Sequence, residues 1–208
     1  MKIIIFGSTG SVGRHIVAQA LAQGHEVTAF ARTPKALNMV HPSLSLVAGN
    51  ALDLNSVENA VKGHDAVLVT LGSPKLSGNI RSAGTANIIK SMEKHNVRRL
   101  ICQTTLGMGE SQGNLNFLWK YLMFGLILRN VFKDHKIQEH DVKHSHLDWV
   151  IVRPAAFTNG PLTSIYKQGF ASNDRNITLK ISRADVANFM LRQLHSDKYL
   201  RWTPGLSY

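Results

Sequence analysis

The chain has little of three features that would point to other classes of protein. It contains a single cysteine, Cys102, so no internal disulfide can form, which fits a reducing compartment. Its longest uninterrupted apolar stretch, residues 121–128, is far shorter than the roughly 20 residues of a membrane-spanning helix. The apolar run before Gly7 is too short for a signal-peptide core of about 7 to 15 residues. We therefore expect a cytoplasmic protein without a membrane span.

Acidic residues are scarce as well. The 208 residues include 13 Asp and Glu against 24 Lys and Arg, which gives a formal net charge of +11. The cations are spread over both halves of the chain, without a basic tail or block. This distribution favours a generally cationic surface that attracts small anionic ligands over a dedicated nucleic-acid interface. We expect a small-molecule ligand, no nucleic-acid partner, and a monomer or weak homo-oligomer.

Short runs rich in Ile, Val and Leu alternate with segments in which apolar residues recur every three or four positions. The expected strands cover residues 2–6, 26–31, 44–48, 65–71, 98–104 and 148–152, and the expected helices cover 11–23, 53–62 and 79–94. Strands that are apolar along their whole length belong in a parallel sheet covered by helices on both faces. The sequence thus predicts an α/β fold with a doubly wound parallel sheet of the Rossmann type.

The length and composition fit one domain, residues 1–208, with 44% hydrophobic and 18% charged residues. We expect a small substrate-side portion of this domain from about residue 153. Two helix starts support the division into elements. Asp53 is placed to cap the helix that follows it, and Ser182 with Asp185 resembles a capping box with a short acid in place of Glu.

A glycine-rich turn follows the first expected strand directly. Glycines at this place allow a sharp turn, a close approach of main chain to a diphosphate, and close packing of helix on strand. The unpaired N–H groups and the positive dipole end of the next helix favour phosphate there. The spacing GxxGxxG is loose by itself, but its position between strand and helix predicts a dinucleotide site. The expected cofactor-binding residues are Gly7, Ser8, Thr9, Gly10, Ser11, Val12 and Gly13.

The end of the second expected strand lacks the acidic residue that would bind the ribose 2′-hydroxyl of NAD. Residues 30–35 read FARTPK, with Arg32 and Lys35 in this region. A guanidinium pairs with a 2′-phosphate through two parallel hydrogen bonds, whereas a carboxylate would repel it. The sequence predicts NADP(H) over NAD(H). The alternative is that Arg32 is merely one of the many cations scattered along the chain.

The opening GSTGSVGRHIVAQALAQGHEVTAFAR resembles that of the atypical short-chain dehydrogenase/reductase family. GNALD, DAVLVTLGS, LDWVIVRP, GPLT and ISRADVANFML are similar to the branch that holds flavin reductases of the biliverdin reductase B type and NmrA-like proteins. The resemblance covers nearly the whole chain and is broken mainly between residues 107 and 132. The order and spacing of these pieces make it specific.

The resemblance implies further cofactor contacts. Residues matching Asn50 and Ala51 lie near the adenine in that family, although the family usually has Asp at position 50. An Asn there can still donate and accept hydrogen bonds. The loop after the fourth strand would line the ribose and diphosphate, and the end of the sixth strand would approach the nicotinamide. The residues concerned are Leu71, Gly72, Ser73, Pro154, Ala155 and Phe157.

The chain departs from the wider superfamily in its catalytic residues. The usual YxxxK pair is replaced by Phe132 and Lys136, so a tyrosine proton relay is absent. The resemblance implies that Lys136 can still hold the ribose, and the alternative is a solvated lysine on a helix. Thr104 and Thr105 stand where the family has a hydroxyl pair, and Thr105 is the candidate for bonding nicotinamide or substrate. The histidine that the branch places near the nicotinamide is replaced by Ala156.

These losses favour acceptors that need no dedicated proton donor. A developing alkoxide needs a donor or oxyanion partner that contributes about 3 to 4 kcal/mol, whereas a reduced flavin or quinone takes its proton from water. We expect an NADPH-dependent oxidoreductase that reduces a flavin, with FMN or FAD as substrate, or another planar conjugated acceptor. The alternative is a non-catalytic NADP(H)-binding sensor of the NmrA type.

Two other features carry weaker expectations. The aromatic segment 115–132 reads as an amphipathic helix packed on the sheet, with a mobile lid over a planar substrate or a membrane-surface helix as alternatives. The histidines of segment 135–146 lack the spacing of a metal site, and we expect them to be exposed on a helix and no metal to bind. A Ser-His-Asp triad is not expected, because the GxSxG turn is missing.

Overall fold

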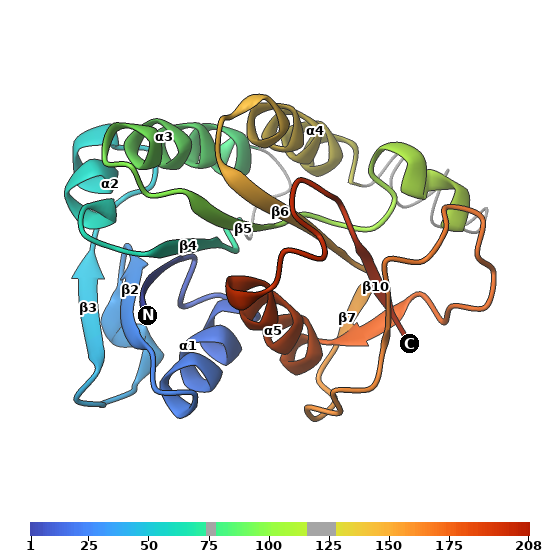
Figure 1. The fold of residues 1–208 in the computed structure, drawn as a ribbon, viewed down its shortest axis with the longest axis horizontal. Helices are drawn as coiled ribbons and strands as arrows, with labels where there is room; N and C mark the ends of the chain where they lie inside the picture. Colours follow the sequence, from blue (N-terminus) through green and yellow to red (C-terminus); the bar gives the residue numbers. More distant parts are fainter. Residues whose placement is uncertain (74–77, 116–127) are drawn as a thin grey trace.

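The computed structural model describes residues 1–73, 78–115 and 128–208. Alternating strands and helices begin with β1 and end with β10 (Figure 1). The first half contains β1 (Lys2–Phe6), α1 (Gly13–Ala22), β2 (Glu26–Ala31), η1 (Pro34–Leu37), β3 (Leu44–Ala48), α2 (Leu54–Val61), β4 (Ala66–Val69) and α3 (Ile80–Lys94). The second half contains β5 (Arg99–Gln103), η2 (Gly109–Asn114), α4 (Arg129–His144), β6 (Asp148–Pro154), β7 (Ala156–Thr158), β8 (Lys167–Gln168), β9 (Lys180–Ser182), α5 (Arg183–Arg192), η4 (Gln193–His195) and β10 (Gly205–Ser207).

The central sheet has the order β3-β2-β1-β4-β5-β6-β10-β8 in the described part of the chain. All neighbours pair in parallel except β10 and β8, which are antiparallel. The chain starts in the middle with β1, runs outward to β3, returns beside β1 as β4 and continues to β6. This reversal between β1 and β4 is the switch point at which doubly wound sheets bind ligands. The predicted fold class, a doubly wound parallel sheet of the Rossmann type, is confirmed.

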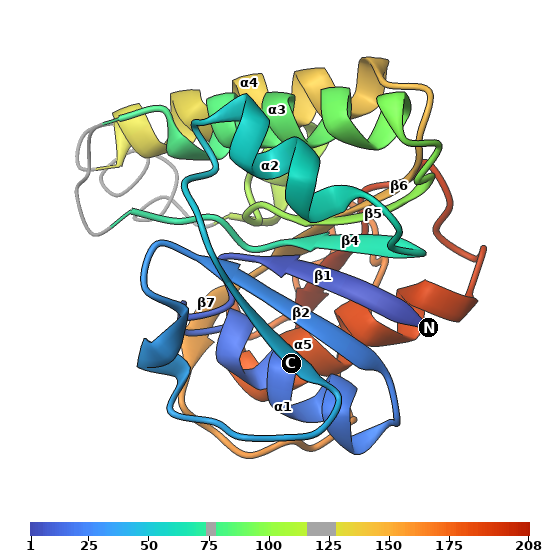
Figure 2. The same ribbon diagram turned by 90° about the vertical axis from the view of Figure 1, so that its left-hand side faces the viewer.

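Both faces of the sheet are covered, as the apolar strands require. Along β1, Ile3 and Ile5 pack with α1 and α5, whereas Ile4 and Phe6 pack with α2, α3 and α4. Figures 1 and 2 show α1 and α5 on one side and α2, α3 and α4 on the other. All four of these side chains are fully buried. Successive residues of β1 therefore contribute to two separate hydrophobic cores, one on each face of the sheet, and neither face is exposed to solvent.

Both predicted helix caps are present. The Asp53 carboxylate accepts a hydrogen bond from the Asn55 N–H at 3.1 Å, and the Ser182 hydroxyl accepts one from the Asp185 N–H at 3.0 Å. Residues 116–127 of the aromatic segment lie outside the described residues, so the three alternatives for that segment stay predictions. Among the described helices, none has both the length and the apolar character needed to cross a bilayer.

The carboxylate of Asp185, in the first turn of α5, joins the segment after β7 and the residue that follows β10 to this helix. It is fully buried and accepts hydrogen bonds from the backbone N–H groups of Thr163 and Ser164 at 2.9 and 2.8 Å. It also accepts one from the Tyr208 hydroxyl at 2.6 Å. Burial alone would raise the pKa of Asp185, but these donors outweigh it and hold the pKa below its ordinary value of 3.8.

We expect Asp185→Asn to lower the free energy of unfolding at neutral pH by about 1 to 3 kcal/mol, because charge-assisted hydrogen bonds are lost. A carboxylate whose folded pKa is depressed stabilises the protein above its unfolded pKa and loses that contribution as the pH falls. The difference between wild type and variant should therefore shrink between about pH 5 and pH 3 in urea titrations. The control is Glu26→Gln, which removes an exposed carboxylate. A difference that does not depend on pH would contradict this role of the charge.

Candidate functional site

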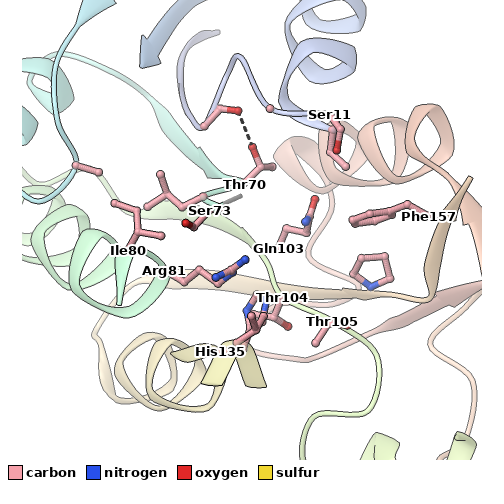
Figure 3. Close-up of a pocket in the computed structure, with 18 of the residues that line it drawn as sticks. Ser11, Thr70, Ser73, Ile80, Arg81, Gln103, Thr104, Thr105, His135 and Phe157 are labelled. Carbon is pink, nitrogen blue, oxygen red and sulfur yellow. Dashed lines mark hydrogen bonds between the residues drawn. The ribbon is translucent and has the colours of Figure 1, made fainter. Parts of the chain in front are cut away.

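One cavity of about 860 Å³ lies along the carboxyl ends of the parallel strands (Figure 3). This volume is typical of cofactor and small-molecule sites. Its walls come from the turn after β1, the ends of β2 and β3, the loop after β4, the ends of β5 and β6, and the first turns of α3 and α4. It brings together most of the predicted residues: Gly7, Thr9, Gly10, Ser11, Val12, Arg32, Asn50, Ala51, Leu71, Gly72, Ser73, Thr104, Thr105, Pro154, Ala155 and Phe157.

The glycine turn is shaped by contacts that a side chain would prevent. Gly7 has a φ of +82°, and a Cβ on it would lie 2.5 Å from the carbonyl oxygen of Thr70. A Cβ on Gly13 would lie 2.2 Å from the Gly7 carbonyl oxygen. These two residues let β1 turn sharply and bring the first residue of α1 down onto the turn.

The start of α1 is open toward the cavity. Val12 occupies its N-cap position, makes no side-chain cap and lines the cavity with Gly10 and Ser11. The first turn of α1 contains no acidic residue that would compete with an anion. Backbone N–H groups and the helix dipole at this place suit a diphosphate.

Ser8 and Gly13 do not line the cavity but support the turn. The Ser8 hydroxyl is fully buried and donates to the Phe30 carbonyl at 3.1 Å, which joins the turn to β2. Gly13 fills the helix-packing position just described. Both residues therefore shape the cavity from behind its wall.

One part of the cavity is formed by the ends of β2 and β3. Arg32 lines the cavity directly after β2 and is exposed, whereas Lys35 lies in η1, is exposed and is not part of the lining. The Asn50 side-chain oxygen accepts from the Leu52 N–H at 3.1 Å, so the amide is fixed across its own turn. Two arginines, Arg32 and Arg81, belong to the lining, and none of the described lining residues is acidic.

Another part of the cavity holds the candidate catalytic residues. Thr105 lines the cavity, and within the described residues its hydroxyl donates one long hydrogen bond, 3.3 Å, to the Leu106 carbonyl. The Gln103 side-chain oxygen is buried without a hydrogen-bond partner in the described part of the chain, and Gln103 faces the cavity (Figure 3). Such an acceptor is costly to leave unpaired, so it suits a ligand that brings an N–H or O–H donor.

Lys136 and His135 show how one helical position changes a side chain's surroundings. Lys136 is exposed and is not among the lining residues, so its predicted contact with the ribose remains a prediction. The preceding residue, His135, is 7% exposed and lines the cavity. The expectation that the histidines of this segment are exposed is therefore wrong for His135, because α4 packs this face against α3. No group of metal-ligating side chains was found among the described residues.

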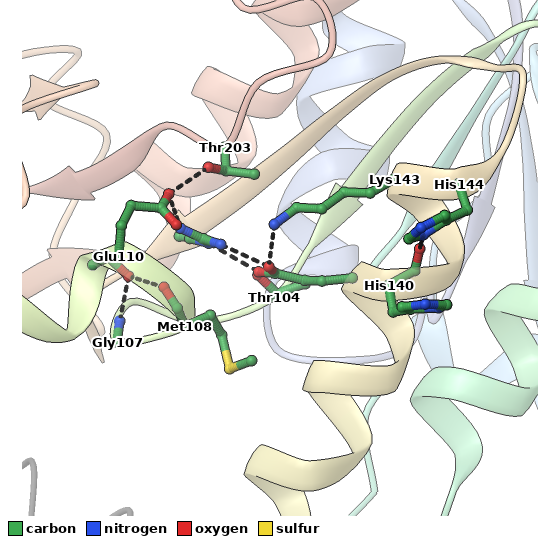
Figure 4. Close-up of polar contacts among 11 residues, drawn as sticks. Thr104, Gly107, Met108, Glu110, His140, Lys143, His144 and Thr203 are labelled. Atoms are coloured by element: carbon green, nitrogen blue, oxygen red, sulfur yellow. Dashed lines mark hydrogen bonds and ion pairs between the residues drawn. The ribbon is translucent and has the colours of Figure 1, made fainter.

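A buried ionic cluster holds the wall behind Thr104 (Figure 4). Arg153 is fully buried and donates to both carboxylate oxygens of Glu139, at 2.9 and 2.7 Å, and to Glu110 at 2.6 Å. The Thr104 hydroxyl donates to Glu139 at 2.8 Å. Burial would raise the pKa of Glu139, but Arg153 outweighs it and holds the pKa below its ordinary value. The cluster ties β5, β6, α4 and η2 together beside the cavity.

A family model described as NAD(P)H-binding matches residues 7–197. The chain belongs to this family. Its fold is that of NAD(P)-binding oxidoreductases of the short-chain dehydrogenase/reductase type, as the resemblance of its motifs predicted.

Solved structures share the fold over the whole chain. A short-chain dehydrogenase/reductase from Veillonella parvula, in complex with NADP, has a TM-score of 0.85 and 19% identity, and covers 100% of this chain and 94% of that one. ChuY, an anaerobilin reductase from Escherichia coli O157:H7, has a TM-score of 0.83 and 23% identity, and covers 100% and 97%. At such identities the likeness concerns the fold.

Several curated relatives are longer than this chain. The photosystem II assembly factor Ycf39 of Synechocystis is 25% identical over 215 residues, which cover 98% of this chain and 61% of that protein. The matches to uncharacterized mycobacterial proteins cover 49% of this chain and only 12% of those proteins.

We expect Gly13→Ala to destabilise the fold by about 1 to 3 kcal/mol and to weaken dinucleotide binding, because the added methyl group overlaps a backbone oxygen that cannot move aside. Thermal unfolding and titration with NADPH would measure both effects. The matched control is Gly160→Ala, whose Cβ would meet its nearest neighbour at an ordinary 3.5 Å. Equal behaviour of the two variants would contradict the packing role of Gly13.

Proposed function

We propose that the protein is an NADPH-dependent reductase of a planar conjugated acceptor such as a flavin. The observation that carries the proposal is that an open helix start and Arg32 line one continuous cavity, without an acidic residue among the described lining. A diphosphate at the start of α1 and a 2′-phosphate at Arg32 would both meet donors there. The family match supports a nicotinamide dinucleotide, and the charge at Arg32 supports the phosphorylated one.

The remaining lining residues fit the reactive end of such a cofactor. Pro154, Ala155 and Phe157 would lie along the nicotinamide, with the Phe157 ring held under the Arg183 guanidinium at 5.2 Å. The Thr105 hydroxyl and the unpaired Gln103 oxygen would bond the carboxamide or the acceptor. Bound NADPH supplies a hydride, and with one proton from water it converts FMN to its dihydro form and leaves NADP⁺.

The acid-base groups of the cavity favour this class of acceptor. Burial, followed by the charge of Arg81, lowers the pKa of His135 to about 4, so His135 is neutral at physiological pH and a poor acid. Tyrosine and lysine are missing from the described lining. A flavin or quinone, whose reduced form is protonated by solvent, needs no such group, whereas a simple ketone does.

The lack of a dedicated proton donor among the described lining residues also supports a second candidate function, an NADP(H)-binding sensor that catalyses no reaction. A cavity that binds the dinucleotide but lacks a dedicated proton donor also suits a protein that signals its bound state to a partner. The two candidates differ in turnover and not in cofactor binding, so one assay separates them.

Purified protein should oxidise NADPH in the presence of at least one acceptor from a panel of FMN, FAD, quinones and biliverdin, followed by the absorbance of the nicotinamide. Binding of NADPH in calorimetry without turnover of any acceptor would favour the sensor. Failure of both NADPH and NADH to bind would contradict both candidates, because each depends on the dinucleotide seat.

Arg32→Asp should weaken NADPH binding about 10- to 100-fold, the range expected when a charge-assisted pair is lost. NADH binding should change far less, since NADH has no 2′-phosphate. The control is Arg98→Gln, at the opposite end of the sheet, where the guanidinium pairs with Asp148 at 3.0 Å. Equal losses of NADPH and NADH affinity in Arg32→Asp would remove the argument for phosphate recognition.

A further inference from the structure

Arg81 is a second cation in the cavity wall, beside the loop after β4, where its Nη2 would lie 4.0 Å from a Cβ on Gly72. It is the second residue of α3, its side chain is 12% exposed, and it lines the cavity. Helices α3 and α4 cover one face of the sheet, whereas α1, whose start is proposed to seat the diphosphate, covers the other (Figure 1). Arg81 thus belongs to a helix on the face of the sheet opposite to α1.

The Arg81 guanidinium keeps much of its hydrogen-bonding capacity. Its ion pair in the described part of the chain is with Asp134, and the two charged atoms are 3.5 Å apart. Asp134 already accepts three shorter bonds, from the Ser82 N–H at 2.9 Å, the Ser82 hydroxyl at 2.6 Å and the Arg81 N–H at 3.1 Å. A guanidinium has five N–H donors, so this single long contact leaves donors for an anion in the cavity.

His135 lies beside Arg81 and adds no second charge. Its Nδ1 contacts the Gln138 side-chain oxygen at 2.9 Å, and the Gln138 amide nitrogen donates to the Thr85 hydroxyl at 3.0 Å. This arrangement assigns the proton to Nδ1 of a neutral imidazole. Figure 3 shows the His135 ring near Arg81 and Thr104 at this end of the cavity.

One described part of the wall near this polar pair is apolar. The wall next to it, from the end of η2 and the start of α4, contributes the side chains of Leu115, Leu128, Val131 and Phe132. A site with one available cation against an apolar wall suits a ligand with a flat hydrophobic body and one acidic substituent.

We propose that Arg81 is a specificity-determining residue that binds a carboxylate or phosphate group on the planar acceptor. The inference rests on the proposed reductase function and specifies its substrate class. The acidic group would lie at the Arg81 guanidinium, and the conjugated body would extend along the apolar wall toward the nicotinamide end of the cavity. A carboxylate and a phosphate would both present an anionic oxygen to Arg81. Two pairs of test acceptors distinguish between these two groups.

The test compares Arg81→Met with wild type on matched acceptors. FMN and riboflavin differ by one phosphate, and a naphthoquinone with a carboxylate side chain differs from menadione by one carboxylate. Arg81→Met should raise KM about 10- to 100-fold for the acidic member of one pair and less than about twofold for its neutral member. The pair that responds identifies the group. Equal responses of acidic and neutral members in both pairs would overturn the proposal.

The control variant is Lys133→Met, which removes an exposed cation that precedes Asp134 and is not in the lining. It should leave all four KM values unchanged. Arg81→Lys should restore part of the preference for the acidic acceptor, because a point charge remains without the planar fork. If Arg81 binds the acceptor and not the cofactor, the NADPH affinity of Arg81→Met, measured by fluorescence, should stay within about twofold of the wild-type value. An equal loss of NADPH and acceptor affinity would make Arg81 a cofactor ligand and overturn the proposal.

A failure of the proposed function is distinguishable from a failure of this inference. If wild type binds NADPH but reduces none of the four acceptors, the proposed reductase function is contradicted. Calorimetry then tests the anion site at Arg81 directly, with FMN and the quinone carboxylate titrated into the protein loaded with NADP⁺. Binding of either compound that is lost in Arg81→Met, but retained in Lys133→Met, supports the anion site. Binding that is equal in wild type and Arg81→Met, or absent in wild type, overturns it.

Discussion

The site depends on how closely α1 can approach the turn after β1. That approach is set by the Gly7 carbonyl, which lies where a side chain on Gly13 would have to be. Because the contact is between backbone atoms, no choice of rotamer can relieve it, and only the absence of a Cβ permits it. With the helix start in this position, Gly10, Ser11 and Val12 line the same cavity as the ends of the neighbouring strands. The N-cap at Val12 has no side-chain cap, so this placement follows from backbone packing and not from a polar side chain.

The other half of the cavity is organised by charge. Replacing the buried Arg153 and Glu139 by apolar residues of similar volume would often cost little, since desolvation offsets much of their attraction. Their value here is geometric: the two-point contact fixes β6 against α4, and the Thr104 hydroxyl and Glu110 add β5 and η2 to the same cluster. The glycine contact thus shapes the cavity wall after β1, and the ion pair supports the wall after β5 and β6.

The parts of this arrangement that depend on local sequence could be predicted. The parallel sheet was predicted from strands that are apolar along their whole length, without alternating polar residues. The glycine turn and Arg32 were identified from their positions directly after β1 and β2. Arg81 and His135 could not be found in this way, because their place in the wall depends on how α3 packs against α4. These helices meet through residues 52 apart in the sequence, as in the bond from the Ser82 N–H to Asp134. Lys136 and His135 differ by about 100° around the helix, and only packing decides which of them faces inward. The caps at Asp53 and Ser182 could be predicted from the sequence, because each capping residue lies directly before its helix.

The distribution of charge along the cavity gives a ligand an orientation. Arg32 lines the cavity at the end of β2 and Arg81 lines it at the start of α3, and the other described lining residues carry no acidic group. A dinucleotide with a phosphate at its adenosine end can satisfy Arg32 and the helix start, yet its nicotinamide end is uncharged apart from the ring itself and offers no anion to a second guanidinium. His135 beside Arg81 adds no charge, and within the described residues the guanidinium is paired with Asp134 at 3.5 Å. Burying a cation costs free energy that a nearby anion offsets. Because Asp134 already accepts three shorter hydrogen bonds, the proposed acidic acceptor would supply a second anion at Arg81.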